Sequence, residues 1–263
     1  MTSAGEVLSA SASNAPAPIA SVGLRLAPDP AREHRALGIC LLGGFRLVLG
    51  GSVMTLSLGA QRLVAFVALQ HGAVRRDLIA GLLWPAVSEG RAHASLRSGL
   101  ARLGDAASCA IAADGIELAL AADVEVDLVE ARQLAHRLLE PGSTMTPAMT
   151  VRAIPLLAAE LLPGWYEDWT LLEVESWRQL RLHALEAAAG LLVVARRFGD
   201  AADAAVAAVR VDPLRESARS ALIGVHLAEG NQSEALREFE RFRVLLDEEL
   251  GLAPTSTLHD LLP

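Results

Sequence analysis

Lysine is absent from this chain, whose 23 basic side chains are all arginine. Its absence excludes chemistry that needs a lysine amine, which includes the Walker A phosphate loop and Schiff-base catalysis. Cysteine is nearly absent too, because Cys40 and Cys109 are the two examples and they lie far apart. They fit neither a metal motif nor a disulfide framework, which indicates a reducing, cytoplasmic location.

Aromatic residues make up 4% of the chain, although 52% of its residues are hydrophobic. Leucine, alanine and valine must therefore fill the core. No uncharged apolar run reaches the roughly 18 residues that a membrane-spanning helix needs. The amino terminus also lacks the basic region and apolar stretch of a signal peptide. We therefore expect no membrane partner.

Motifs of enzymes and metal sites are missing as well. The seven histidines show no His-x-x-x-His or His-x-x-Glu-His spacing, and no Gly-x-Ser-x-Gly nucleophile elbow occurs. The acidic pairs Glu167/Asp168 and Glu173/Glu175 are open to an acid–base interpretation. They lie in the richest aromatic cluster of the chain, which favours a packed helix junction instead. The aromatic residues are Trp165, Tyr166, Trp169 and Trp177. We expect no catalytic residue, no metal site and no cofactor.

The length of 263 residues predicts two domains, and the charges divide the chain in the same way. Between residues 37 and 104, seven arginines stand against Asp77 and Glu89, a balance of +5. Between residues 128 and 263, 13 arginines stand against 20 acidic residues, a balance of −7. The net charge of −8 argues against a nucleic-acid-binding protein as a whole. A basic first part and an acidic second part, however, indicate two units with different partners.

Residues 1–36 are rich in alanine, serine and proline without periodicity, and we predict a disordered tail there. The short β-rich runs that follow are separated by Gly43-Gly44 and Gly50-Gly51. Neither glycine pair opens a helix, so we predict a meander of small strands rather than phosphate-binding loops.

Two helices are predicted next, from Gly59 to Gly72 and from Arg75 to Trp84. The inward residues expected of the second helix are Leu78, Ile79, Leu82 and Leu83. Farther along, Asp114-Gly115 separates the β-rich runs 109–113 and 116–120, which is a strong hairpin signal.

Between these elements lies the most informative stretch, a predicted helix from Ser88 to Gly104 that Ser88 can cap. At a helical period, Leu96, Leu100 and Leu103 form an apolar stripe that needs a core. A second face carries polar side chains and no acid: Arg91, Ser95, Ser98 and Arg102, with Arg97 on its edge. Arginine suits phosphate and guanine edges, and serine can serve either. Periodicity alone leaves open a solvated helix face or a surface that contacts DNA.

The order of elements favours DNA contact. Strands, three helices and a hairpin follow one another as in a winged helix-turn-helix, where the third helix enters the major groove and the hairpin is the wing. We therefore predict a winged-helix DNA-binding domain at residues 37–127, with 88–104 as its recognition helix. Further phosphate contacts are expected from Arg62, Arg75 and Arg76, which lie near predicted helix starts.

The rest of the chain is predicted to be helical. Residues 128–150 form a linking helix and linker, and residues 151–263 form the second domain. There Ala187 matches Ala221, Gly190 matches Gly224 and Ala201 matches Ala235, each at an offset of 34 residues. Thirty-four residues is the tetratricopeptide period. The fold class expected is an α+β winged helix-turn-helix domain followed by an all-α tetratricopeptide-like repeat domain.

Several segments resemble the Streptomyces antibiotic regulatory protein family. Ile39-Cys-Leu-Leu-Gly-Gly-Phe-Arg-Leu, Leu58-Gly-Ala-Gln-Arg-Leu, Leu83-Trp-Pro and Ala94-Ser-Leu-Arg-Ser resemble its DNA-binding half. Leu161-Leu-Pro-Gly-Trp-Tyr-Glu-Asp-Trp and Glu248-Glu-Leu-Gly-Leu-Ala-Pro resemble its bacterial transcriptional activator domain. The resemblance spans about residues 37–263. It implies a transcription activator that binds promoter repeats in double-stranded DNA and recruits RNA polymerase, as a homodimer or a DNA-induced oligomer.

This sequence departs from the family pattern in the recognition helix and the wing. The family leads us to expect a large aromatic residue at Ala101 and arginines near Gly104 and Asp105. Gly99 costs the helix up to about 1 kcal/mol against alanine, and Asp114 at the hairpin tip repels phosphate. An alternative therefore stays open: a protein-interaction regulator whose winged helix is a scaffold with weak or no DNA binding. A positive strip broken by Asp105 and Asp114 would favour it.

Overall fold

The computed structural model describes residues 37–104 and 108–262, so the predicted tail at residues 1–36 lies outside the described chain. Strands β1 (Leu37–Cys40), β2 (Arg46–Leu49) and β3 (Ser52–Met54) form the predicted antiparallel meander. Both glycine pairs have positive φ angles, as tight turns between strands require. Strand β7 (Val124–Val126), which the sequence did not reveal, pairs with β1 in parallel and gives the order β3-β2-β1-β7.

The three predicted helices of the first part are α2 (Leu58–Leu69), α3 (Arg76–Leu83) and α4 (Glu89–Ala101). One expectation for α3 is wrong: Leu78 is 54% exposed and Leu82 is 42% exposed, whereas Ile79 and Leu83 are buried. Leu78 and Leu82 form one stripe along the helix, and Ile79 and Leu83 form a second stripe. The two stripes adjoin because successive helical residues are about 100° apart around the axis. The rest of the protein packs against the stripe of Ile79 and Leu83 and leaves the stripe of Leu78 and Leu82 exposed.

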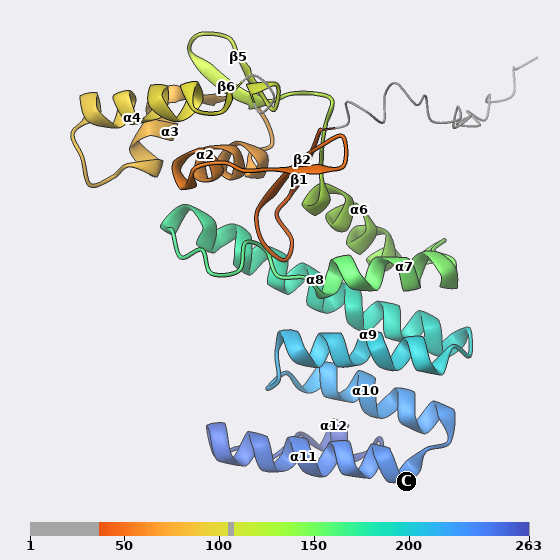
Figure 1. Cartoon of the computed structure of the whole chain (residues 1–263). Helices are drawn as coiled ribbons and strands as arrows, with labels where there is room; N and C mark the ends of the chain where they lie inside the picture. The colour runs from red at the N-terminus through yellow and green to blue at the C-terminus, as the bar shows by residue number, and fades with distance from the viewer. Residues whose placement is uncertain (1–36, 105–107, 263) are drawn as a thin grey trace, which may run out of the picture.

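The predicted hairpin is confirmed as β5 (Ile111–Ala113) and β6 (Glu117–Leu120), which pair antiparallel. Gly115 has a φ of 98°, a left-handed value that suits glycine in the tight turn. Strand β4 (Val74–Arg75) pairs with β6 and completes a three-stranded sheet of order β4-β6-β5. Figure 1 shows this hairpin beside α3 and α4, at the end of the molecule away from α11.

The second part consists of helices, and α8 to α11 stack in succession (Figure 1). The helices are α6 (Asp127–Leu139), α7 (Pro147–Ala158), α8 (Asp168–Val194), α9 (Phe198–Val211), α10 (Glu216–Glu229), α11 (Gln232–Leu250) and α12 (Ser256–His259). The 34-residue offset relates α8 to α10 and α9 to α11. Ala201 of α9 and its match Ala235 of α11 are both fully buried, where a small residue lets helices approach closely.

The two parts share a hydrophobic core and polar ties. One cluster of buried apolar side chains extends from β1 to α10. The Asp127 carboxylate at the start of α6 accepts hydrogen bonds from the backbone N–H groups of Leu41 (2.8 Å) and Leu42 (3.1 Å). The backbone N–H of Gly43 donates to the carbonyl of Glu160 at 2.7 Å. The sheet is therefore fastened to α6 and to the segment that precedes α8.

The aromatic cluster lies at this junction, as a packed arrangement requires. Trp169 of α8 meets Phe66 of α2 edge-to-face with ring centroids 5.3 Å apart, and Trp165 packs on Trp169 at 6.1 Å. The Trp177 indole is 1% exposed and donates to the Ala159 carbonyl at 3.0 Å. Tyr166, predicted to join the cluster, is 85% exposed. The rings thus join α8 to α2 across the two parts of the chain.

Candidate nucleic-acid interface

Helix α4 is anchored by its apolar stripe. Ala92, Leu96 and Leu103 are at most 4% exposed, Leu100 is half-buried, and the helix packs against α2 and α3. Ser88 occupies the N-cap position, but its carbonyl rather than its side chain accepts hydrogen bonds, from the backbone N–H groups of Arg91 and Ala92. Burial of one stripe fixes the rotation of α4, and with it the direction of every polar side chain.

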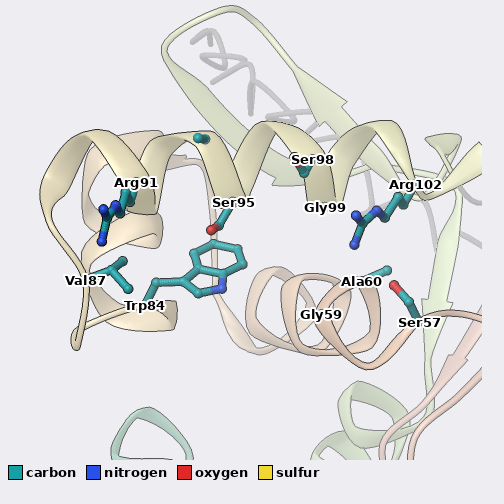
Figure 2. A pocket seen from close by; sticks show the side chains of 11 residues that line it. Ser57, Gly59, Ala60, Trp84, Val87, Arg91, Ser95, Ser98, Gly99 and Arg102 are labelled. Carbon is teal, nitrogen blue, oxygen red and sulfur yellow. The ribbon is translucent and has the colours of Figure 1, made fainter.

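A groove of about 480 Å³ runs between α4 and the start of α2. Four of the predicted α4 residues line it: Arg91, Ser95, Ser98 and Arg102. Figure 2 shows the two arginines toward opposite ends, the two serines between them, and the Trp84 ring below Ser95. The polar face predicted from the helical period is therefore one wall of a surface groove.

Arg97, the fifth predicted residue of α4, does not line this groove. It precedes Ser98 by one residue and is therefore rotated by about 100° around the helix axis. Its side chain is exposed. The sequence placed it on the edge of the polar face, whereas the structure separates it from the other four.

The arginines of α4 differ in pairing from those predicted elsewhere. Arg91, Arg97 and Arg102 form no ion pair with any carboxylate in residues 37–104 or 108–262. Arg62, by contrast, holds Glu167 at an Nε–Oε1 distance of 3.0 Å, and Arg75 holds Asp77 at 2.6 Å. The guanidinium groups beside the groove thus remain available to an external anion.

The remaining predicted contacts lie apart from the groove. Arg62 faces α8 through its ion pair, and Arg75 and Arg76 lie at the start of α3. Arg76 is half-buried, and its Nε atom has no hydrogen-bond partner within the described part of the chain. The structure therefore does not bring these three side chains together with the arginines of α4.

The groove residues that the sequence did not reveal include Ser57, Trp84 and Val87. Trp84 is the C-cap residue of α3, and its ring forms part of the groove wall. Ser57 is the N-cap residue of α2, and its side chain makes no capping hydrogen bond.

Asp114, the acid expected to repel phosphate, lies at the tip of the β5–β6 hairpin. The Oδ1 atom of Asp114 accepts hydrogen bonds from the backbone N–H groups of Ile116 (3.2 Å) and Glu117 (2.9 Å). Asp114 is exposed, and its carboxylate stabilises the turn. The second acid of interest, Asp105, lies outside the described residues.

The polar side chains of the groove can form hydrogen bonds with an external ligand. Two guanidinium groups without an ion pair among the described residues and two hydroxyl groups offer hydrogen bonds and positive charge, as phosphate and base edges require. No group of three or more histidine, cysteine or acidic side chains that could hold a metal ion occurs among the described residues. Within the same residues, no helix is long and apolar enough to cross a membrane.

Comparisons with known proteins place this geometry in context. The family model of the bacterial transcriptional activator domain matches residues 123–262, a range that includes α6. No curated relative matches the sequence significantly. In fold, the chain resembles EmbR of Mycobacterium tuberculosis, solved in complex with a low-affinity phosphopeptide, with a TM-score of 0.63 and 21% identity. The alignment covers 86% of this chain and 64% of EmbR, so the chain spans less than two thirds of that protein.

Proposed function

The chain belongs to the bacterial transcriptional activator domain family. We propose that it is a transcriptional regulator of the Streptomyces antibiotic regulatory protein type, which activates transcription by binding double-stranded DNA through α4. In this proposal, residues 37–127 form a winged helix-turn-helix domain. Helix α4 is the recognition helix and the β5–β6 hairpin is the wing. The helical part acts as a tetratricopeptide-like repeat domain in which α8–α9 and α10–α11 are equivalent pairs.

The observation that carries the DNA-binding proposal is the pair Arg91 and Arg102. Both lie beside the α4 groove, and neither forms an ion pair with a described carboxylate. Four of the seven exposed arginines in the described helical part are paired with an acid three positions away, as Arg197 is with Asp200 and Arg243 with Glu240. The other three form no ion pair with a described carboxylate, so the position of Arg91 and Arg102 beside the groove is what distinguishes them. An unpaired arginine gains more from a phosphate than a paired one, because no internal ion pair has to break.

The test is a gel-shift titration on upstream DNA fragments selected from the source genome. We expect Arg91→Ala and Arg102→Ala each to weaken binding by about 1–3 kcal/mol if they contact base edges, which is roughly five- to 150-fold. A base contact also lowers specificity at one repeat position. A phosphate contact weakens all sequences alike and reduces the salt slope by about 0.9 per contact.

Arg152→Ala is the matched control, because Arg152 is an exposed arginine of α7 in the helical part. Its removal changes the net charge equally and leaves the groove intact. Equal affinities for the wild type and the Arg91→Ala/Arg102→Ala double variant would remove α4 as the DNA contact. They would favour the alternative of a protein-interaction regulator with a scaffold winged helix.

The contact with RNA polymerase is a separate part of the proposal. It is supported by the outer face of α3, where Leu78 is 54% exposed and Leu82, one turn later, is 42% exposed. Adjacent exposed apolar side chains favour a protein partner. We expect Leu78→Ser/Leu82→Ser to reduce activated transcription in vitro while DNA affinity stays unchanged. Leu250→Ser, at a residue 53% exposed in α11, is the control.

Two copies of the chain are proposed to bind each operator, because one recognition helix reads few base pairs. The stoichiometry of the complex on DNA with one repeat and with two repeats tests this part. Binding of a single copy with equal affinity to both DNAs would contradict it.

A further inference from the structure

The helical part contains a pocket that the proposed DNA contact does not use. It measures about 390 Å³ and lies between α8 and the segment 160–166, with Val211 of α9 at its edge. Its volume is within the range of small-molecule sites, about 300–1,000 Å³. Apolar and aromatic side chains form most of its wall: Leu161, Leu162, Trp165, Val174, Trp177 and Val211.

Arg181 places a positive charge in this apolar wall. The residue is 5% exposed, and its Nη1 atom donates to the carbonyl of Ala158 at 2.8 Å. Its Nε atom has no hydrogen-bond partner among the described residues, and Arg181 forms no ion pair with them. Charged groups this deeply buried are normally paired with an opposite charge. This guanidinium therefore lacks the anion that its burial requires.

The neighbouring charges do not supply that anion. Arg178, which also lines the pocket, is already held by Glu175 and Asp212. Glu160 is exposed at the pocket and attracts Arg181 at longer range, while burial lowers the pKa of Arg181 below its ordinary value. The hydrogen bond to Ala158 satisfies the last turn of α7, which accounts for one donor of a guanidinium that has five.

The backbone of the pocket wall is held in an unusual conformation. Leu162 has a φ of 44°, a left-handed value that is rare for a residue with a side chain. Its N–H donates to the Leu41 carbonyl at 2.9 Å, and Leu42 and Leu161 form a β-bridge. Backbone strain of this kind concentrates at ligand sites. The wall is thus fastened to the end of β1, in the other part of the chain.

We propose that this pocket binds a small organic anion, a carboxylate on an apolar body, whose carboxylate pairs with Arg181. The apolar body lies against Trp165 and Trp177, and the carboxylate accepts from the guanidinium donors that the protein leaves unused. An occupant would contact Leu161 and Leu162, whose backbone is paired with the residues that directly follow β1. This pocket shares no lining residue with the α4 groove, so the proposal stands or falls independently of DNA binding. The test below measures ligand binding directly.

The experiment is isothermal titration calorimetry of the full chain with phenylacetate and octanoate, each compared with its neutral amide. We expect saturable binding of at least one carboxylate and binding at least tenfold weaker for the matching amide. Tryptophan fluorescence should change over the same concentration range, because two of the four tryptophans line the pocket.

Two tryptophan substitutions provide a matched pair. Leu171 lines the pocket and is 52% exposed, whereas its neighbour Leu172 is 84% exposed and lies outside it. We expect Leu171→Trp to fill the entrance and reduce affinity at least tenfold, and Leu172→Trp to bind as the wild type does. Arg181→Gln should abolish the preference for carboxylate over amide.

Three results would overturn the proposal. The first is no saturable heat with either carboxylate, which would leave Arg181 as a cap on α7 alone. The second is equal binding of acid and amide. The third is equal affinity of the Leu171→Trp and Leu172→Trp variants, a comparison that holds even if Arg181→Gln does not fold.

Discussion

Replacement of Gly99 by alanine is expected to stabilise the protein, although Gly99 is buried in α4 at the groove. A glycine in a helix interior is about 0.8–1.0 kcal/mol less favourable than alanine. A Cβ atom at position 99 would lie 3.6 Å from the Leu63 Cδ2 atom, which is an ordinary van der Waals distance. The added methyl group thus fits without displacing α2, and the gain in helix propensity should be nearly fully realised.

The matched substitution at the other end of the same segment has the opposite sign. Gly104 has a φ of 69°, and a left-handed residue with a Cβ atom costs roughly 1–2 kcal/mol. Gly99→Ala should therefore raise the free energy of unfolding by about 1 kcal/mol, and Gly104→Ala should lower it by at least as much. For a chain of this size, 1 kcal/mol corresponds to a shift of about 2–4 °C in the thermal midpoint.

The assay is urea unfolding followed by circular dichroism, with the m-value compared among the three proteins. An unchanged m-value shows that the midpoint reports stability rather than a change in exposed surface. Gly99→Ala should also keep the DNA affinity of the wild type, because its methyl group contacts Leu63. Loss of stability in Gly99→Ala would refute the reasoning, since it would mean that α4 and α2 pack more closely than the 3.6 Å contact implies.

Three further predictions concern the junction between the two parts and α8. Trp177→Phe keeps the ring buried but leaves the Ala159 carbonyl without its indole donor, so the free energy of unfolding should fall by about 1–3 kcal/mol in urea titration, and no change would contradict the hydrogen bond. Asp127→Ala removes the acceptor of two backbone N–H groups between the sheet and α6 and should cost about as much or more; faster hydrogen exchange confined to the β1–β2 turn is the confirming readout. Hydrogen bonds from Arg178 and Gln179 lower the pKa of the exposed Glu175 from 4.5 to about 2, so its contribution to stability is complete above pH 4.5 and is lost as the pH falls toward 2. The difference in thermal midpoint between the wild type and Glu175→Gln should shrink over that range, and a constant difference would count against the ion pair.

The local elements followed from the sequence because their signals are local. Glycine pairs at positive φ gave the turns of the first sheet, and Asp114-Gly115 gave the hairpin. The 3.6-residue period separated the buried stripe of α4 from its polar face. The family resemblance is confirmed by the match over residues 123–262. The roles of the α4 arginines in DNA binding stay predictions.

Tertiary structure decided which of two equivalent stripes became core and which charges stayed free. Leu78 and Ile79 are equally apolar, and only the packing of α3 exposes the first and buries the second. Arg62 and Arg102 carry the same group, but the fold brings Glu167, 105 positions away from Arg62, within 3.0 Å of it. A periodic pattern specifies directions around one helix, whereas ion pairs and burial depend on which distant segments the chain brings against it. For that reason the sequence supplied the helix and its faces, and the fold supplied the groove and the buried charge of Arg181.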